Sequence, residues 1–253
     1  MKSKPMTTND LHLREGERIE DLHRSGYRLI QDPEEFCFGV DAVLLASFAE
    51  AKKGDAVLDL CTGTGVVPIL MEARTPAEKL FGVEIQPEAA ERAARSVGLN
   101  GLEEKIQIIE GDIRKLDEFF LPSSFDVITA NPPYMNSGGG IENSNKPKAI
   151  ARHEILCTLE DVIFAADRFL KTGGKFYMIH RPFRLGDIMA LLRKYRLEPK
   201  RIRFVHPYVD KKPTMVLVEA VRRGNPMVDV MPPLIIYNKD GSYTDEVFRI
   251  YYE

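Results

Sequence analysis

The chain has 253 residues, enough for one sizeable core, and its 44% hydrophobic and 29% charged residues are typical of a soluble globular protein. No apolar run reaches the roughly 18 to 20 residues of a membrane span, and the polar N-terminus lacks the apolar centre of a signal peptide. Cys37, Cys61 and Cys157 stand without CxxC or Cys/His spacing, which indicates neither disulfides nor zinc. These features predict a cytoplasmic protein without a metal site, and they indicate no oligomeric state.

Strand-like and helix-like runs alternate from residue 55 onward, which is typical of a parallel sheet with helices on both faces. Ahead of them, FGVDAVLLASFAE is expected to form a helix capped by Asp41. The predicted strands are 56–60, 79–85, 105–110, 125–130 and 174–180. The predicted helices between them are VVPILMEA, PEAAERAARSVGLN and TLEDVIFAADRFLKTGG, the last stopped by its two glycines.

The pattern changes after the fifth strand. A helix over 185–195 leads to RIRFVH and PTMVLVEAV, which are joined by the short turn PYVDKK. Two strands so close can pair only antiparallel, because a parallel crossover needs a dozen or more residues. The sequence therefore predicts an α/β core over 55–223 with a seven-stranded, mostly parallel sheet and an antiparallel last strand. An N-terminal extension (1–54) and a C-terminal appendage (224–253) flank this core.

The first predicted strand runs into the turn DLCTGTG, which holds Asp59, Cys61, Thr62, Gly63 and Gly65. The glycines allow a tight turn and a close approach by a ligand at the start of the next helix. The dinucleotide pattern GxGxxG is absent, and a carboxylate at the strand end would repel a pyrophosphate. A ligand that carries an ammonium and a sulfonium but no phosphate, such as S-adenosylmethionine (SAM), fits this turn better.

Two further acids follow strand ends. Glu84, beside Ile85, can accept hydrogen bonds from both hydroxyls of a ribose. Asp112 could accept from an adenine amine with Ile113 packed on the ring, or it could simply cap a helix. Because ligands of open α/β sheets bind at the carboxyl ends of strands, the three acids together predict a nucleoside site.

The fourth predicted strand ends in NPPY, formed by Asn131, Pro132, Pro133 and Tyr134. The amine of an aromatic base is a poor nucleophile because its lone pair is delocalised into the ring. The Asn131 side-chain oxygen and the Pro132 carbonyl, held rigidly by the prolines, can accept from its hydrogens and direct the lone pair at a methyl group. Tyr134 offers a face on which the base can stack. This pattern predicts a catalytic site for methylation of an amine.

DLCTGTG, VEIQPEAAERA, GDI and NPPY together resemble the SAM-dependent amino-methyltransferases. With FCFGVDAVLLASF, ARHE, HRPFR, RFVHP and PLIIYNKDGSYT, nearly the whole chain resembles the bacterial valine-tRNA adenine N6-methyltransferases. The resemblance implies a class I SAM-dependent methyltransferase fold, which is Rossmann-like, and methylation of the adenine 3′ to the anticodon, position 37. It also implies that the family's acids and NPPY correspond to Asp59, Glu84, Asp112, Asn131, Pro132 and Tyr134.

Residues 181–223 carry twelve Lys and Arg against four Asp and Glu, a formal charge of +8 in a chain whose net charge is −3. Either a polyanion binds there or the segment forms solvated faces. For a tRNA anticodon stem-loop, whose loop bases are already unpaired, the candidate contacts are Arg181, Arg184, Lys200, Arg201, Arg203 and His206.

NPPY also occurs in protein-glutamine and DNA-adenine methyltransferases, so those substrates remain alternatives. A SAM-binding or RNA-binding module without catalytic activity is a third alternative, although such a module would not need an amide that polarises an amine.

Overall fold

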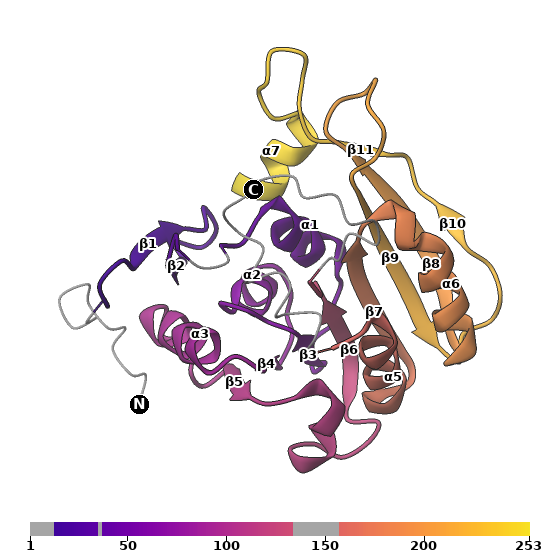
Figure 1. The fold of residues 1–253 in the computed structure, drawn as a ribbon, viewed down its shortest axis with the longest axis horizontal. Helices are drawn as coiled ribbons and strands as arrows, with labels where there is room; N and C mark the ends of the chain where they lie inside the picture. Colours follow the sequence, from indigo (N-terminus) through magenta and orange to yellow (C-terminus); the bar gives the residue numbers. More distant parts are fainter. Residues whose placement is uncertain (1–12, 35–36, 134–156) are drawn as a thin grey trace.

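The computed structural model describes residues 13–34, 37–133 and 157–253, which form a nine-stranded mixed sheet, helices on both of its faces and a separate hairpin (Figure 1). The strands of the main sheet are β3 (Ala56–Leu60), β4 (Lys79–Glu84), β5 (Ile106–Glu110), β6 (Phe125–Ala130), β7 (Leu170–His180), β8 (Leu197–His206), β9 (Met215–Arg222), β10 (Asp229–Val230) and β11 (Leu234–Ile235). The helices are α1 (Val40–Phe48), α2 (Val66–Arg74), α3 (Pro87–Leu99), α5 (Leu159–Phe169), α6 (Leu185–Lys194) and α7 (Asp245–Tyr252), with 3₁₀ turns η1 (Ile113–Glu118) and η2 (Pro182–Arg184).

The strand order is β10-β8-β9-β7-β6-β3-β4-β5, with β11 also beside β8. β3 to β7 run parallel, and β9 is antiparallel to both β7 and β8. The seven long strands therefore form the predicted sheet, and the two-residue strands β10 and β11 extend it. The class I methyltransferase architecture expected from the sequence is confirmed.

Alternate residues of the central strands supply two separate cores, because successive side chains of a strand point to opposite faces. Val57, Val127 and Tyr177 pack with α1 and α2 on one face. Leu58 and Ile128 pack with α5 and α6 on the other face. Figure 1 shows these two helical layers on either side of the sheet. Both faces of β3 and β6 are covered, so the ends of these strands are the parts that remain open to a ligand.

Among the predicted strands, β8 begins at Leu197, four residues before RIRFVH, and β9 begins at Met215, two residues after the start of PTMVLVEAV. The five predicted parallel strands agree with the structure to within one residue, except at β7. The glycine stop predicted for the preceding helix is wrong: α5 ends at Phe169, and Gly173 and Gly174 lie inside β7. The reason is that Leu170 is fully buried and pairs with Phe125 of β6, so the backbone is already extended there.

The predicted N-cap of α1 is also wrong. The N-cap is Gly39, which has no side-chain cap bond, and Asp41 lies in the first turn, where its carboxylate accepts from the Ala42 amide at 2.9 Å. A negative charge in the first turn still interacts favourably with the helix dipole.

The segments outside residues 55–223 pack on the core. A hairpin of β1 (Arg18–Asp21) and β2 (Arg28–Gln31), which the sequence analysis did not predict, lies against α3. α1 packs on α2, and α7 contacts α1 and β11 at the end of the chain. No helix of the described residues is both long and apolar enough to cross a membrane.

Candidate cofactor and active site

Asp59, Glu84 and Asn131 come together at one edge of the sheet. β6, β3 and β4 are neighbouring parallel strands, so their carboxyl ends meet there, and Asp59 lies opposite Thr129 in the β3–β6 register. The three side chains are neighbours because the strands that they end or follow are neighbours in the sheet.

The turn after β3 is shaped by left-handed backbone. Gly63 has φ +56° and Gly65 has φ +83°, conformations that favour glycine. A β-carbon on Gly65 would lie 3.2 Å from the Ala93 Cβ of α3, so glycine also lets the two helices approach closely. The Thr62 amide donates to the Val83 carbonyl at 3.0 Å, which ties the turn to β4.

Asp59 is a buried carboxyl, with 1% of its surface exposed. Burial raises its pKa to about 7, the nearby Glu84 charge adds to that rise, and a hydrogen bond donated by the Thr129 hydroxyl at 2.6 Å opposes it. No lysine or arginine of the described residues forms an ion pair with it. An ammonium group of a ligand would supply the missing positive charge.

Glu84 is 4% exposed, and backbone amides hold it in place. One carboxylate oxygen accepts from the Gly63 amide at 2.9 Å and the other from the Gln86 amide at 3.0 Å. The Gln86 side-chain amide also donates to it, at 3.5 Å. A carboxylate has about four acceptor positions, so one remains open to a ribose hydroxyl, and a second opens if a ligand displaces the long Gln86 contact.

Asp112 follows β5 and takes the structural role that the sequence analysis left open, since it is the N-cap of η1 and accepts from the Arg114 amide. Its carboxylate also forms a bidentate pair with the Arg114 guanidinium, at 2.6 Å for the closest contact, and this pair lowers its pKa. Ile113 is buried and Ile85 is half-buried.

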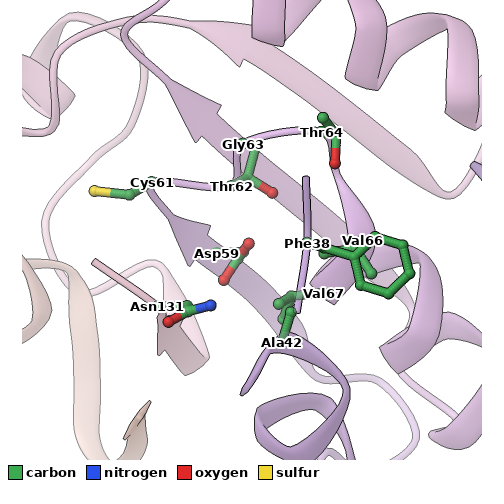
Figure 2. A pocket seen from close by; sticks show the side chains of 10 residues that line it. All are labelled: Phe38, Ala42, Asp59, Cys61, Thr62, Gly63, Thr64, Val66, Val67 and Asn131. Atoms are coloured by element: carbon green, nitrogen blue, oxygen red, sulfur yellow. The ribbon is translucent and has the colours of Figure 1, made fainter. Parts of the chain in front are cut away.

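A pocket opens at this edge (Figure 2). Figure 2 shows Asp59 and Asn131 side by side on neighbouring strands, with Phe38 on the side of Val66 and Val67. The pocket is lined by Phe38, Ala42, Asp59, Cys61, Thr62, Gly63, Thr64, Val66, Val67 and Asn131. Five of these residues were predicted. Phe38 and Ala42 were missed because they precede the core in sequence and reach the pocket only through the packing of α1.

NPPY is described up to Pro133, with Pro132 buried and Asn131 and Pro133 half-buried. Tyr134 lies outside the described residues. Because Asn131 directly follows β6, its amide faces the pocket that Asp59 lines from β3.

Three of the predicted RNA contacts lie at this same edge. Arg181 and Arg184 follow β7, and His206 is the last residue of β8. A guanidinium nitrogen of Arg181 donates to the Thr214 carbonyl at 3.1 Å, and Arg184 pairs with Asp187 at 2.8 Å. The Arg181 contact joins the turn after β7 to the turn between β8 and β9, whereas the Arg184 pair lies within its own turn and the start of α6.

The other three predicted RNA contacts, Lys200, Arg201 and Arg203, lie within β8 and contact other groups of the protein. Lys200 donates to the Asn225 carbonyl, and Arg201 pairs with Glu219 and with Glu50. Arg203 pairs with Glu246 of α7 at 2.7 Å. Part of the positive excess of residues 181–223 is therefore compensated by acids from other segments.

The residues present suit SAM. The pocket places the buried carboxyl of Asp59 next to a turn whose backbone allows close approach, and the Glu84 carboxylate on the adjacent strand retains a free acceptor position. This set of groups suits an ammonium and hydroxyls, and it disfavours a pyrophosphate. Among the described residues, no group of three or more His, Cys, Asp or Glu could hold a metal ion.

Comparison with known proteins agrees with this geometry. A family model described as a methyltransferase domain matches residues 51–198. A tRNA1(Val) (adenine(37)-N6)-methyltransferase from Porphyromonas gingivalis is 31% identical over 221 residues, covering 84% of this chain and 86% of the relative. One from Histophilus somni is 28% identical and covers 87% and 90%. A solved structure described as a predicted O-methyltransferase from Agrobacterium tumefaciens has a TM-score of 0.68 at 25% identity and covers 83% and 94%.

The fold and the pocket thus define a class I methyltransferase, an enzyme whose methyl donor is SAM. The chain belongs to the tRNA1(Val) (adenine(37)-N6)-methyltransferase family, as its motifs predicted.

Proposed function

We propose that the protein transfers the methyl group of SAM to N6 of adenine 37 in a valine tRNA, and that Asn131 and the Pro132 carbonyl activate the amine. The observation that carries this proposal is the position of Asn131 in the same pocket as Asp59, on the adjacent strand. A methyl donor held at Asp59 therefore lies within reach of an amine held at Asn131.

The cofactor is held from three strand ends. Asp59 binds the ammonium of SAM, the turn with Cys61, Thr62, Gly63 and Gly65 surrounds its amino-acid part, and Glu84 accepts from the ribose hydroxyls. Ile85 and Ile113 pack against the adenine ring, and Asp112 accepts from its amine in exchange for one of the hydrogen bonds that Arg114 donates to it.

The protein's own chemistry is positioning and polarisation of the target amine. The Asn131 oxygen and the Pro132 carbonyl accept from the two amine hydrogens, and their partial negative charges stabilise the positive charge that grows on nitrogen during transfer. Pro132 and Pro133 fix the backbone so that these acceptors need little reorganisation. Tyr134 stacks on the flipped adenine.

The tRNA enters along the edge formed by the turns after β7 and β8. Arg181, Arg184 and His206 lie there and contact phosphates of the anticodon stem-loop, whose unpaired bases cost little to extrude. Lys200, Arg201 and Arg203 lie within β8, where their pairing inside the protein leaves them a lesser role. The enzyme acts in the cytoplasm, where tRNA is modified.

The test is a methylation assay with radiolabelled SAM that offers unmodified tRNA, duplex DNA and protein as separate substrates, followed by nucleoside analysis of the tRNA. We expect label in N6-methyladenosine of the tRNA alone, at position 37 of valine tRNA. Label in protein glutamine or in DNA would show that protein or DNA, and not tRNA, is the substrate.

A variant test addresses the mechanism. Asn131→Ala should lower single-turnover methylation by about 10²–10³-fold, the usual cost of losing one preorganised electrostatic partner, while SAM still binds. The matched control is Asn225→Ala, an exposed asparagine far from the strand edge, which should leave the rate unchanged. Near-normal turnover of Asn131→Ala with both substrates bound would rule out activation of the amine by this residue.

A further inference from the structure

Two cysteines that lie far apart in sequence meet beside the cofactor pocket. Cys61 follows β3, and Cys157 immediately precedes Thr158, the N-cap of α5. Their sulfurs are 3.8 Å apart, within hydrogen-bond distance for sulfur, and both are free thiols. The third cysteine, Cys37, contacts the Asp32 carbonyl instead.

The backbone of Cys61 is unusual. Its φ is +59°, in the left-handed region that the neighbouring Gly63 and Gly65 also occupy. A residue with a β-carbon is strained there, and a short polar side chain such as Asn or Asp is the usual exception. A strained cysteine in a ligand-binding turn points to a role for its sulfur.

The two thiols differ in acidity. The hydrogen bond between the sulfurs lowers the pKa of Cys157 and raises the pKa of Cys61, the pattern of a Cys61 thiol that donates to Cys157. Burial and the charges of Asp161 and Glu84 oppose the lowering of the Cys157 pKa, and the positive charge of Arg114 adds to it. Because the thiolate is the nucleophile in thiol chemistry, Cys157 is the sulfur that reacts first with an oxidant.

We propose that Cys61 and Cys157 form a redox-modification site, which hydrogen peroxide converts to a reversible disulfide that weakens SAM binding. The Cys157 thiolate attacks a peroxide oxygen, which gives a sulfenic acid and hydroxide. The Cys61 sulfur then attacks the sulfenic sulfur, the S–S bond forms, and the hydroxyl leaves as water with the Cys61 proton. Two thiols are oxidised and one peroxide is reduced to two waters.

The effect on SAM follows from where the disulfide bond forms. A disulfide is about 2.05 Å long, so the sulfurs must approach by roughly 1.8 Å. Cys61 is directly bonded to Thr62, and the Thr62 and Gly63 amides are tied to Val83 and Glu84. A pull on Cys61 therefore distorts the turn that surrounds the cofactor. By linkage, bound SAM must oppose oxidation to the same extent.

The part of this inference that concerns SAM rests on the proposed function, whereas formation of the disulfide does not. The test therefore has two separate readouts. Reduced protein is treated with hydrogen peroxide, and disulfides are mapped by mass spectrometry of a non-reduced digest. SAM affinity is then measured by calorimetry before oxidation, after oxidation and after re-reduction with dithiothreitol.

We expect a peptide pair that joins Cys61 to Cys157 in the wild type and in Cys37→Ser, and none in Cys157→Ser. Oxidation should weaken SAM binding by about fivefold or more in the first two proteins, in the range of ordinary coupling energies, and leave Cys157→Ser unchanged. Dithiothreitol should restore the affinity, and saturating SAM should slow formation of the disulfide.

Absence of the Cys61–Cys157 pair, or sulfinic and sulfonic acids alone, overturns the redox site whatever the enzyme methylates. A disulfide that forms without a change in SAM affinity overturns its effect on the cofactor. If even the reduced protein fails to bind SAM, the proposed function fails, and the mapped disulfide still decides whether the redox site exists.

Discussion

Asp59 carries its carboxyl at the end of β3 almost without contact with water, and burial raises its pKa to about 7. A buried carboxylate without a cation costs stability, and in the proposed site the ammonium of SAM supplies that cation. On this proposal Asp59 lowers the stability of the SAM-free protein and strengthens the binding of SAM.

SAM affinity should therefore depend on pH. Below pH 7 Asp59 is protonated in the free protein, so affinity should fall by up to tenfold per pH unit, the limit for one proton. At higher pH the affinity should stop rising and then fall, because the α-ammonium of SAM loses its own proton. Calorimetry between pH 5.5 and 9 checks this expectation, with Asp126→Asn at the start of β6 as the control that keeps the pH dependence. A flat profile would exclude Asp59 as the partner of the ammonium.

Replacement of Asp59 by Asn should affect binding and stability in opposite directions. A carboxyl whose pKa is raised in the folded state contributes stability at low pH and loses it as pH rises toward 7. Without SAM, Asp59→Asn should therefore be more stable than the wild type at pH 8, and the difference should shrink as pH falls below 7. Thermal melting at several pH values, with and without SAM, measures both effects. Lower stability of the variant at pH 8 would contradict this account.

Glu84 provides a second test of the site. Glu84→Ala removes the acceptor for the ribose hydroxyls and should weaken SAM binding by about 1–3 kcal/mol. Because Glu84 also accepts from the Gly63 amide, Glu84→Gln serves as the companion variant that keeps an acceptor oxygen and should lose less affinity. If calorimetry shows unchanged SAM affinity for Glu84→Ala, Glu84 does not bind the ribose hydroxyls.

At the scale of elements, the ends of β7 and β8 differ from the body of β8. Arg181, Arg184 and His206 lie at or just after the strand ends, at the same edge of the sheet as the pocket, whereas Lys200 and Arg203 contact Asn225 and Glu246. Residues close in sequence thus have different surroundings, because the ends of β7 and β8 lie at the pocket's edge of the sheet and the body of β8 contacts α7 and the segment after β9.

A salt titration of tRNA binding separates these two groups of cations. Arg181→Gln with Arg184→Gln should reduce the slope of log affinity against log salt by about 0.7–0.9 for each phosphate that the protein no longer neutralises. Lys200→Gln with Arg203→Gln removes the same charge and should change the slope less. An equal change in both double variants would show that charge, and not the strand edge, determines RNA binding.

At the scale of the whole molecule, ion pairs join the N-terminal hairpin to the core. Glu17 precedes β1, and its side chain is 1% exposed between Arg92 and Arg95 of α3, at 3.1 Å and 2.5 Å. The hydrogen bonds from Arg95 lower the pKa of Glu17 to about 2. The ion pairs of Glu17 therefore attach the hairpin to α3, a helix that packs on the sheet.

Glu17→Gln should destabilise the protein by on the order of 2–4 kcal/mol at pH 7, because two arginines lose a buried partner. A lowered carboxyl pKa contributes stability above pH 4.5 that is lost as pH falls toward 2, so the difference should be smaller at pH 3 than at pH 7. Urea unfolding at pH 7 and pH 3 measures it. The control is Arg14→Ala, whose exposed pair with Glu91 should contribute less than about 1 kcal/mol. Equal losses in both variants would contradict a special role for Glu17.

Local sequence patterns were sufficient to predict the strands of the core and the residues at its edge. Parallel strands bring their carboxyl ends to one side, so Asp59, Glu84 and Asn131 could be placed together from their positions after apolar runs. The motifs around them also indicated the family. The prediction succeeded here because each of these residues directly ends or follows a predicted strand.

The contributions of distant segments depend on tertiary packing instead. Phe38 and Ala42 line the pocket because α1 packs on α2, and Arg203 is paired because α7 returns to β8. Cys61 and Cys157, isolated in sequence, meet because α5 begins beside the turn after β3. Such contacts depend on how helices pack across the sheet, and no local pattern of apolar and polar residues specifies that packing.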